Sequence, residues 1–445
     1  MTSSYNRMES KPPTYAPATN PALMRRALAP RSRTVEGPSR TDGSALLRSH
    51  QVSDDPATAG IQIIQVRTLE ELADHADSWN KMLEESPTGS PMQSYPQISA
   101  YLETQLTPSD NWFCLFAYIQ GELIGVLPLI LVRSFRLPWY SVCILKTPYD
   151  VLHTGSVDCL ASPGREDVIE VFVRHLMRSR ILPVIRIREI AESSPTLTHL
   201  KNPCGALVAV RFHSGAENFI DVPQDFEAYR ADFSTNFRRQ LKRGGKKFDE
   251  LPGGQFRCRD LLRTVSENFD RFERVEDAGW KGVSDSSLRA MPANLRLFRL
   301  AAERFNRLGW MEWNFLEAGD QTIAAHYAVR KGRVLYLLKI GYDEAFSGCS
   351  PGNLLLEKVV ESACKSGALD EINCVADCAW HRNWNMKQRL LHDVIILPCL
   401  PLVGKWLARF GTSSTCGRII AKLRRRGSAL ASPSLTPKPA NSYVP

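Results

Sequence analysis

The sequence predicts a mixed α/β protein (α/β or α+β in class) in which one unit occurs twice, each copy a mixed, mainly antiparallel sheet flanked by helices. Two observations support this prediction. Each half shows the same order of elements: a hairpin of two apolar segments, the tripeptide Ser-Pro-Gly, a helical segment and an apolar strand. The two tripeptides, at residues 162–164 and 350–352, occupy matching places in this order. A tandem duplication accounts for both observations together.

The elements of the first copy follow from its turn residues and apolar runs. We expect a hairpin, a helix and a strand over residues 112–135, 165–179 and 182–190. The hairpin turns at Gly121. Glu166 and Asp167 stand at the start of the helix, where their negative charge would repel a phosphate group. We therefore expect this copy to be structural or to bind an acceptor.

The second copy has a longer helical preface. Its expected helices cover residues 229–248, 261–275 and 287–308; the first is basic and open to a break at Gly244-Gly245. In the third, apolar residues recur at spacings of three and four, which is typical of a helix that packs on a core. Three strands, a helix, a strand, a helix and a last strand should follow, over residues 311–315, 322–330, 334–340, 353–366, 369–375, 380–391 and 393–397.

Composition limits the class of protein. The chain has 445 residues, of which 43% are hydrophobic and 23% charged, as in globular proteins of several domains. The charge balance, 56 − 47 = +9, permits an anionic partner without selecting one. The 11 cysteines include no closely spaced metal-type pair, so we expect reduced thiols in a cytoplasmic protein and no metal. The longest aliphatic run, residues 123–132, is about half a bilayer span, which excludes a transmembrane helix.

Both ends of the chain differ in composition from the middle. Residues 1–59 contain seven prolines and two aromatic residues, and we expect them to be disordered. Residues 401–445 form a basic extension with a polar tail, whose apolar and basic residues allow at most a peripheral membrane contact. The two domains should then cover residues 60–215 and 216–400.

Several motifs in this order resemble one acyltransferase family. They are Gly279-Trp280-Lys281-Gly282, Tyr342-Asp343-Glu344-Ala345-Phe346, Ser350-Pro351-Gly352 at the start of a helix, the segment 121–129 and the basic stretch 233–243. Over residues 60–400 the chain is similar to the GNAT superfamily, and in particular to its FemAB-like, CelD-type branch, associated with cellulose and exopolysaccharide biosynthesis. The resemblance implies two tandem GNAT-like domains.

The same resemblance implies a reaction. An acyl group, expected to be acetyl, would pass from acyl-CoA to an amine or hydroxyl of a small-molecule or glycan acceptor, such as a precursor in exopolysaccharide or cell-envelope biosynthesis. Proteins of exopolysaccharide biosynthesis would be partners. Two alternatives stay open: a FemX-like transferase that uses aminoacyl-tRNA, the one case in which nucleic acid is expected, and a non-catalytic scaffold of a polysaccharide synthase.

The cofactor end is expected at a strand-to-helix junction of small residues. Its candidate residues are Ser347, Gly348, Ser350, Gly352 and Asn353. Small side chains let the backbone approach an anion, and the free N–H groups of the helix favour a pyrophosphate. The alternative is an ordinary turn in which serine and proline start a helix. The segment departs from the usual GNAT pattern of a basic residue or Gln before Gly-x-Gly or Gly-x-Ala.

Four residues are candidates for proton transfer. Asp343 could deprotonate the acceptor or simply cap its loop, and His326 could be a general base or a buried structural histidine. Tyr342 ends the strand at which the resemblance places the thioester. Many GNAT enzymes protonate the thiolate with a tyrosine in the segment after the loop, but this chain has no tyrosine between Tyr342 and Tyr443. His381, Cys378 or water would replace it, or no acid is needed.

The acceptor pocket has four candidate residues, Trp280, Lys281, Asp377 and Trp384. The alternative for each tryptophan is a place in the core. The basic residues 238–247 recur at a spacing of four and could bind an anionic partner, although such runs are usually solvated faces.

Overall fold

A computed structural model describes residues 60–136, 141–149, 157–177, 181–201 and 207–398. All of them belong to one structural unit, Gly43–Pro445. The sequence predictions for residues 1–59 and 401–445 lie outside the described residues. Residue ranges and side chains discussed below belong to the described part of the chain.

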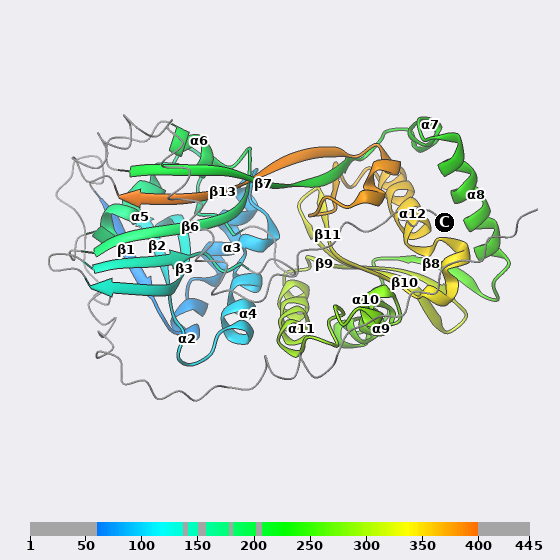
Figure 1. Cartoon of the computed structure of the whole chain (residues 1–445), viewed down its shortest axis with the longest axis horizontal. Coiled ribbons are helices and arrows are strands. Elements are labelled where there is room, and N and C mark those ends of the chain that lie inside the picture. Colours follow the sequence, from blue (N-terminus) through cyan, green and yellow to red (C-terminus); the bar gives the residue numbers. More distant parts are fainter. Residues whose placement is uncertain (1–59, 137–140, 150–156, 178–180, 202–206, 399–445) are drawn as a thin grey trace, which may run out of the picture. The chain divides into compact units, whose positions relative to one another are not determined.

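The strands of the described residues form one 13-stranded sheet (Figure 1). Those of the first half are β1 (Ile61–Val66), β2 (Asn111–Ile119), β3 (Glu122–Arg136), β4 (Ser141–Lys146), β5 (Leu160–Ala161) and β6 (Ile181–Ala191). Those of the second half are β8 (Gly254–Cys258), β9 (Met311–Ala318), β10 (Gln321–Lys331), β11 (Val334–Tyr342) and β12 (Glu371–Asn373). Two long strands, β7 (Leu207–Asp221) and β13 (Lys387–Pro398), lie between the halves in the order β6-β13-β7-β12.

Helices surround the sheet in both halves. The first half has α2 (Leu69–Ala73), α3 (Ala76–Glu85), η3 (Pro91–Gln93), α4 (Tyr95–Gln105), α5 (Val168–Met177) and α6 (Pro195–Lys201). The second half has α7 (Phe226–Ala231), α8 (Thr235–Asp249), α9 (Val265–Asp277), α10 (Trp280–Val283), α11 (Pro292–Arg307), η4 (Glu344–Cys349), α12 (Pro351–Ser366) and η5 (Ala379–Trp384).

The repeated unit that the sequence predicts is confirmed by strand pairing. In each half three strands form an antiparallel meander, a helix follows, and the next strand pairs parallel to the third: β6 with β4, and β12 with β11. Gly121 and Gly319 stand in the corresponding hairpin turns, both with positive φ. The prolines match less closely, since Pro351 is the first residue of α12 whereas Pro163 lies in the turn before α5.

The last strand of each half is exchanged. β13, at the end of the second half, pairs with β6 of the first half, and β7 pairs with β12 of the second. β13 and β7 also pair with each other along the whole of β13. The expected domain boundary at residue 215 therefore falls inside strand β7.

Three helices differ from their predicted bounds. The helix expected over residues 229–248 is divided into α7 and α8, and α8 continues through Gly244-Gly245 without a break. The helix expected over residues 380–391 is only the short η5, and the strand after it begins at Lys387, because residues 387–391 pair with β7. The helix expected from residue 261 begins at Val265, where Thr264 and Glu267 form a capping box.

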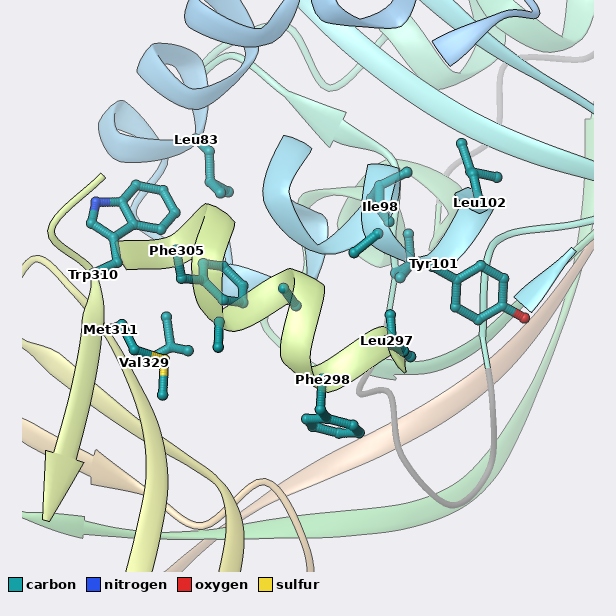
Figure 2. Close-up of a cluster of buried hydrophobic side chains, with 14 of the residues drawn as sticks. Leu83, Ile98, Tyr101, Leu102, Leu297, Phe298, Phe305, Trp310, Met311 and Val329 are labelled. Atoms are coloured by element: carbon teal, nitrogen blue, oxygen red, sulfur yellow. The ribbon is translucent and has the colours of Figure 1, made fainter. Parts of the chain in front are cut away.

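The apolar face of α11 is buried as its spacing predicts. Phe298, Ala302 and Phe305 belong to a large core cluster that also includes residues of α4. Figure 2 shows Tyr101 of α4 near Leu297 of α11. Burial of large side chains on both helices stabilises this contact by about 1.5–3 kcal/mol per fully buried residue.

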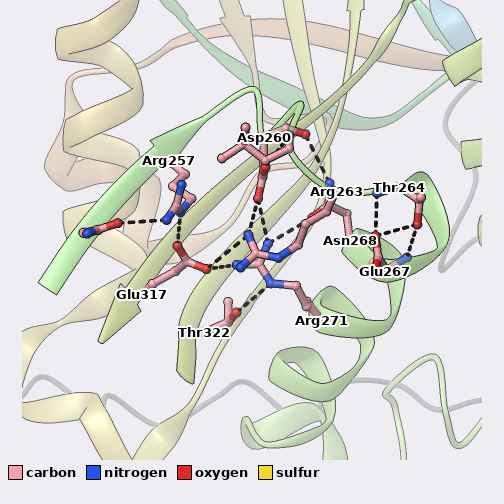
Figure 3. A network of polar contacts seen from close by, with 11 residues as sticks. Arg257, Asp260, Arg263, Thr264, Glu267, Asn268, Arg271, Glu317 and Thr322 are labelled. Carbon is pink, nitrogen blue, oxygen red and sulfur yellow. Dashed lines mark hydrogen bonds and ion pairs between the residues drawn. The ribbon is translucent and has the colours of Figure 1, made fainter. Parts of the chain in front are cut away.

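A charged network holds α9 against the strands (Figure 3). The guanidinium of Arg271, whose side chain is 8% exposed, donates to the Asp260 carboxylate at 2.9 Å and to that of Glu317. Arg257, on strand β8, also donates to Glu317. Thr322 of β10 accepts a further bond from Nε of Arg271 at 3.2 Å. The network links the helix with three strands through buried charges that satisfy one another.

Candidate active site

The parallel strand pairs of the two halves differ in the length over which they pair. In the first half β4 and β6 pair along six residues, from Ser141 to Lys146. In the second half β11 and β12 pair only from Val334 to Tyr336. The chain then leaves β12 and follows β7, where Asn218 bonds the main chain of residues 374 and 376. Residues 337–342 of β11 and the segment after β12 therefore diverge, and we call the region between them the opening. Strands β4 and β6 of the first half do not diverge in this way.

An irregularity in β11 lies at the start of this opening. The register of β10 and β11 shifts there: Ala328 pairs with Leu337 and Tyr327 with Lys339, so Leu338 is an extra residue. Such a bulge bends and twists a strand. Beyond it, the carbonyl oxygen of Ile340 accepts a hydrogen bond from Lys281 rather than from a strand. Because N–H and C=O of one residue point the same way in an antiparallel pair, the N–H of Ile340 faces the opening too.

Lys281 lies across the opening. Its Nζ is 2.8 Å from the carbonyl oxygen of Ile340 and 3.1 Å from Oε1 of the buried Glu276. On the other side lies Cys378, in the segment after β12. Burial and the charge of Asp377 raise the pKa of the Cys378 thiol, and the charge of Lys281 partly offsets this. An ammonium group thus stands between the two diverging segments.

The strand end leads into the first turn of α12. Asp343 is the N-cap of η4, where its side chain accepts bonds from the N–H of Ala345 and from Gln321. Burial, with Glu344 adding to it, raises the pKa of Tyr342 to about 12. A Cβ built on Gly352 would lie 3.4 Å from the Tyr342 ring, so the ring packs against the start of α12.

The amide groups that begin α12 are not capped by Ser350, its N-cap. Ser350 has a left-handed backbone and makes no side-chain bond to the helix; instead its hydroxyl accepts a bond from Gln240 of α8 at 3.2 Å. Gly348 is close to a second residue of α8, since a Cβ there would lie 3.4 Å from Nζ of Lys247. The basic helix α8 therefore flanks the start of α12.

The segment after β12 is fixed by Asn218, a residue of strand β7. Its amide donates to Oδ1 of Asp377 at 2.9 Å and to Nδ1 of His381 at 3.0 Å. The N–H of Cys378 also donates to Nδ1 of His381. Two donors on Nδ1 place the proton of the neutral ring on Nε2. Burial lowers the pKa of His381 to about 4, so the imidazole is neutral at pH 7.

A sequence comparison relates the second half to a known domain. Residues 235–377 match the sequence model of the acetyltransferase (GNAT) domain. The segment is therefore similar to that domain. It spans α8 to Asp377 and so includes the bulge, the opening and the first turn of α12. No curated protein matches the sequence.

Several solved structures are similar to the chain at low identity. FemX matches with 10% identity over 75% of this chain and 96% of that one, at a TM-score of 0.49. The C-terminal domain (DUF2156) of a putative lysylphosphatidylglycerol synthetase from Agrobacterium fabrum matches with 10% identity over 73% and 92%, at 0.43. A tandem GNAT protein from the clavulanic acid biosynthesis pathway matches with 10% identity over 75% and 98%, at 0.37. Scores this low transfer no substrate to the present chain.

The two tryptophans expected at the acceptor pocket differ in burial. Trp384 is fully buried among Phe233 and Phe237, and its indole N–H donates to Oδ1 of Asn353 at 3.1 Å. Trp280, by contrast, is 56% exposed next to Lys281.

His326 has no described polar contact with the other candidates. It is fully buried on the face of β10 that packs on α12, beside Ala324 and Ala328, and it pairs with Ile340 of β11. Neither ring nitrogen has a hydrogen-bond partner among the described residues, and burial lowers its pKa to about 3. The described contacts therefore do not join His326 to Asp343, Tyr342 or His381.

Sequence reasoning missed three groups that shape the opening: Asn218, Glu276 and the main chain of Ile340. Only Glu276 had a local signal, since it lies five residues before Lys281 and directly after the helix expected over residues 261–275. Among the described residues no group of three His, Cys, Asp or Glu side chains is placed to bind a metal ion. Within the same ranges, every helix is too short or too polar to cross a membrane.

Proposed function

We propose that residues 216–400 transfer an acyl group, acetyl in the simplest case, from acyl-CoA to an amine or hydroxyl of a small-molecule or glycan acceptor. The opening between β11 and β12 supports this proposal most directly. It runs along residues 337–342 and ends at the first turn of α12, within the segment that matches the GNAT model. The parallel pair β4–β6 stays joined, so the first half has no corresponding place for the donor.

The residues at the start of α12 fit the phosphate groups of the donor. Ser350 leaves the helix amides uncapped, Gly348 and Gly352 have no side chain, and Lys247 supplies a positive charge beside Gly348. A helix N-terminus with free N–H groups and a nearby cation favours an anion. Ser347 and Asn353 complete this binding region in the proposal.

The other end of the opening fits the reacting thioester. The main-chain N–H of Ile340 faces the opening and can polarise a carbonyl group, which stabilises the tetrahedral intermediate. Asp343 is placed at the strand end, where Oδ2 bonds only the side chain of Gln321 among the described groups; it is our candidate for the proton from the acceptor. His381 positions the segment on the far side.

The acceptor is proposed to approach from the side of α10. Trp280 is exposed there, and its flat, amphipathic ring can bind the face of a sugar while Asp377 bonds hydroxyl groups. A precursor of an exopolysaccharide or of another cell-envelope glycan satisfies both features.

One observation favours a second candidate, a transferase that uses aminoacyl-tRNA. The face of α8 away from the core carries exposed cations that no acidic side chain neutralises among the described contacts; they are Arg238, Arg239, Lys242, Arg243, Lys246 and Lys247. A row of this kind binds the phosphate backbone of RNA without sequence preference.

Thermal-shift titration of the full chain separates the candidates. A ligand that binds only the folded protein raises the melting temperature as its concentration rises above Kd. The proposal predicts a rise with acetyl-CoA and none with tRNA. A rise with tRNA alone would favour the second candidate, and no rise with either ligand would favour a non-catalytic scaffold.

A further inference from the structure

The segments around Lys281 pack very closely against each other. A Cβ on Gly279 would lie 2.6 Å from the carbonyl oxygen of Tyr342, and one on Gly341 would lie 2.8 Å from Cα of Glu276. Any residue with a side chain would clash at either position. The two glycines therefore allow α9 and α10 to pack directly on β11. Lys281 therefore projects from a rigid support into the space between β11 and Cys378.

The described partners of Lys281 fix its ammonium group and occupy two of its three N–H donors. An ammonium has three hydrogen-bond donors, and the described contacts, Glu276 and the carbonyl oxygen of Ile340, take two. The carboxylate of Glu276 is fully buried and also faces Lys339 at 3.8 Å. A charged group next to a partly closed site acts more strongly than the same group in water.

Of the other ionisable side chains around the opening, Lys339 faces the buried Glu276 at 3.8 Å, and His381, Cys378 and Tyr342 are poor sources of positive charge. His381 is neutral at pH 7, since its pKa lies near 4 and Nδ1 is occupied by two donors. Burial raises the pKa of the Cys378 thiol, and Tyr342 has a pKa of about 12. Lys281 is the described cation that reaches the main-chain groups of β11 at the opening.

We propose that the ammonium group of Lys281 faces the sulfur atom of CoA and stabilises it as the thiolate leaves. This inference rests on the proposed function and adds a catalytic residue to it. In this inference acyl-CoA is the acyl donor, a substrate of the reaction. Ile340 links polarisation of the thioester with stabilisation of the thiolate. Its N–H can polarise the thioester carbonyl, and its C=O accepts a hydrogen bond from Lys281.

The proposed step balances as follows. The acceptor nitrogen or oxygen forms a bond to the carbonyl carbon, and the carbon–sulfur bond breaks with its electron pair on sulfur. Lys281 gives a proton to the sulfur and becomes a neutral amine. The proton that the acceptor loses passes to Asp343 and from there, directly or through water, restores the ammonium group. The products are the acylated acceptor and free CoA, and no oxidant or metal is needed.

The test measures the acidity of the bound thiol, so it does not depend on knowing the acceptor. Ultraviolet absorbance of the thiolate is followed from pH 7 to 9 in complexes of the full chain with CoA. The same protein with desulfo-CoA is subtracted, which removes the signal of the protein's own cysteines. An opposite charge within about 4–6 Å lowers the pKa of an acidic group by roughly 1–3 units.

Three variants complete the test. In Lys281→Gln the thiol of bound CoA should titrate at least about one unit higher than in the wild type, whereas desulfo-CoA should bind within about threefold of wild type. Lys281→Arg keeps the charge and should recover part of the shift. Lys365→Gln, on the exposed side of α12, is the matched control and should behave as wild type.

The outcomes separate the inference from the proposed function. If both ligands bind and the thiol titrates alike in wild type and Lys281→Gln, the inference is wrong and the donor site stands. If neither ligand binds the wild type, the proposed function fails and the inference fails with it. If Lys281→Gln does not fold, the wild type still decides, because a bound thiol no more acidic than that of free CoA contradicts the inference.

Discussion

Gly244 of α8 lies directly against the carbonyl oxygen of Cys349: a Cβ built on this glycine would be only 2.4 Å from that oxygen. The sequence prediction treated Gly244-Gly245 as a place where the basic helix could break. The structure shows instead that the missing side chain allows α8 to contact the loop before α12. This contact brings Gln240 and Lys247 to the start of α12.

The first prediction concerns this contact. Gly244→Ala should push α8 away from the loop, lower the free energy of unfolding by about 1–3 kcal/mol and weaken acetyl-CoA binding by roughly tenfold. Gly245→Ala is the matched control: a Cβ there meets only Leu354 at 3.9 Å, and alanine favours the helix by up to about 1 kcal/mol. Chemical denaturation and calorimetry measure both effects. Equal behaviour of the two variants would contradict the close approach.

The second prediction concerns the charged network of Figure 3. Arg271→Leu leaves the buried carboxylates of Asp260 and Glu317 without their main partner and should lower the free energy of unfolding by about 3–5 kcal/mol. The exposed pair Arg333–Asp370 offers a control, and Arg333→Leu should change stability little. Denaturant unfolding of the three proteins at pH 7 compares them. A small effect of Arg271→Leu would mean that the network is not buried as described.

The third prediction is a pH dependence that originates at His326. Its pKa is about 3 in the folded protein and 6.5 in an exposed chain, so below pH 6.5 the unfolded state binds a proton that the folded state does not. Stability therefore falls as pH falls, by about 1.4 kcal/mol per unit, or about 2 kcal/mol between pH 6.5 and 5.

His326→Leu should remove this part of the pH dependence. At pH 7 the variant should be at least as stable as the wild type, because the buried ring has no hydrogen-bond partner among the described residues. Acyl transfer should stay within about threefold of wild type, since the His326 ring has no described polar contact with Asp343, Tyr342 or His381. Unfolding curves at pH 7 and 5 test the first statement. A loss of activity of a hundredfold or more, in a folded variant, would restore His326 as a general base.

Local signals were enough to predict much of the fold. Gly121 and Gly319 mark two hairpin turns because glycine readily adopts positive φ, and Pro351 begins a helix because its fixed φ suits the first helical position. The strand β13 was not predicted in full. Residues 387–391 form a strand because they pair with β7, and no local pattern reveals a partner about 170 residues away.

The candidate site was predicted where it depends on local chemistry. Tyr342, Asp343 and Gly352 follow one another along a strand end, a loop and a helix start, and the structure keeps them together. Asn218 and the main chain of Ile340 were missed. Asn218 acts on His381 from 163 residues away, and a main-chain group has no side-chain signature at all.

Calorimetric titration of acetyl-CoA into the wild type, Gly348→Asp and Gly164→Asp tests the central claim that the donor binds at the start of α12. A carboxylate at residue 348 stands beside Lys247 and would repel the phosphates, so affinity should fall by more than about a hundredfold. Residue 164, the last residue of the Ser-Pro-Gly tripeptide in the first half, is the control; aspartate tolerates its positive φ, and affinity should stay within about threefold of wild type. Equal losses in both variants, or no loss in either, would contradict the claim.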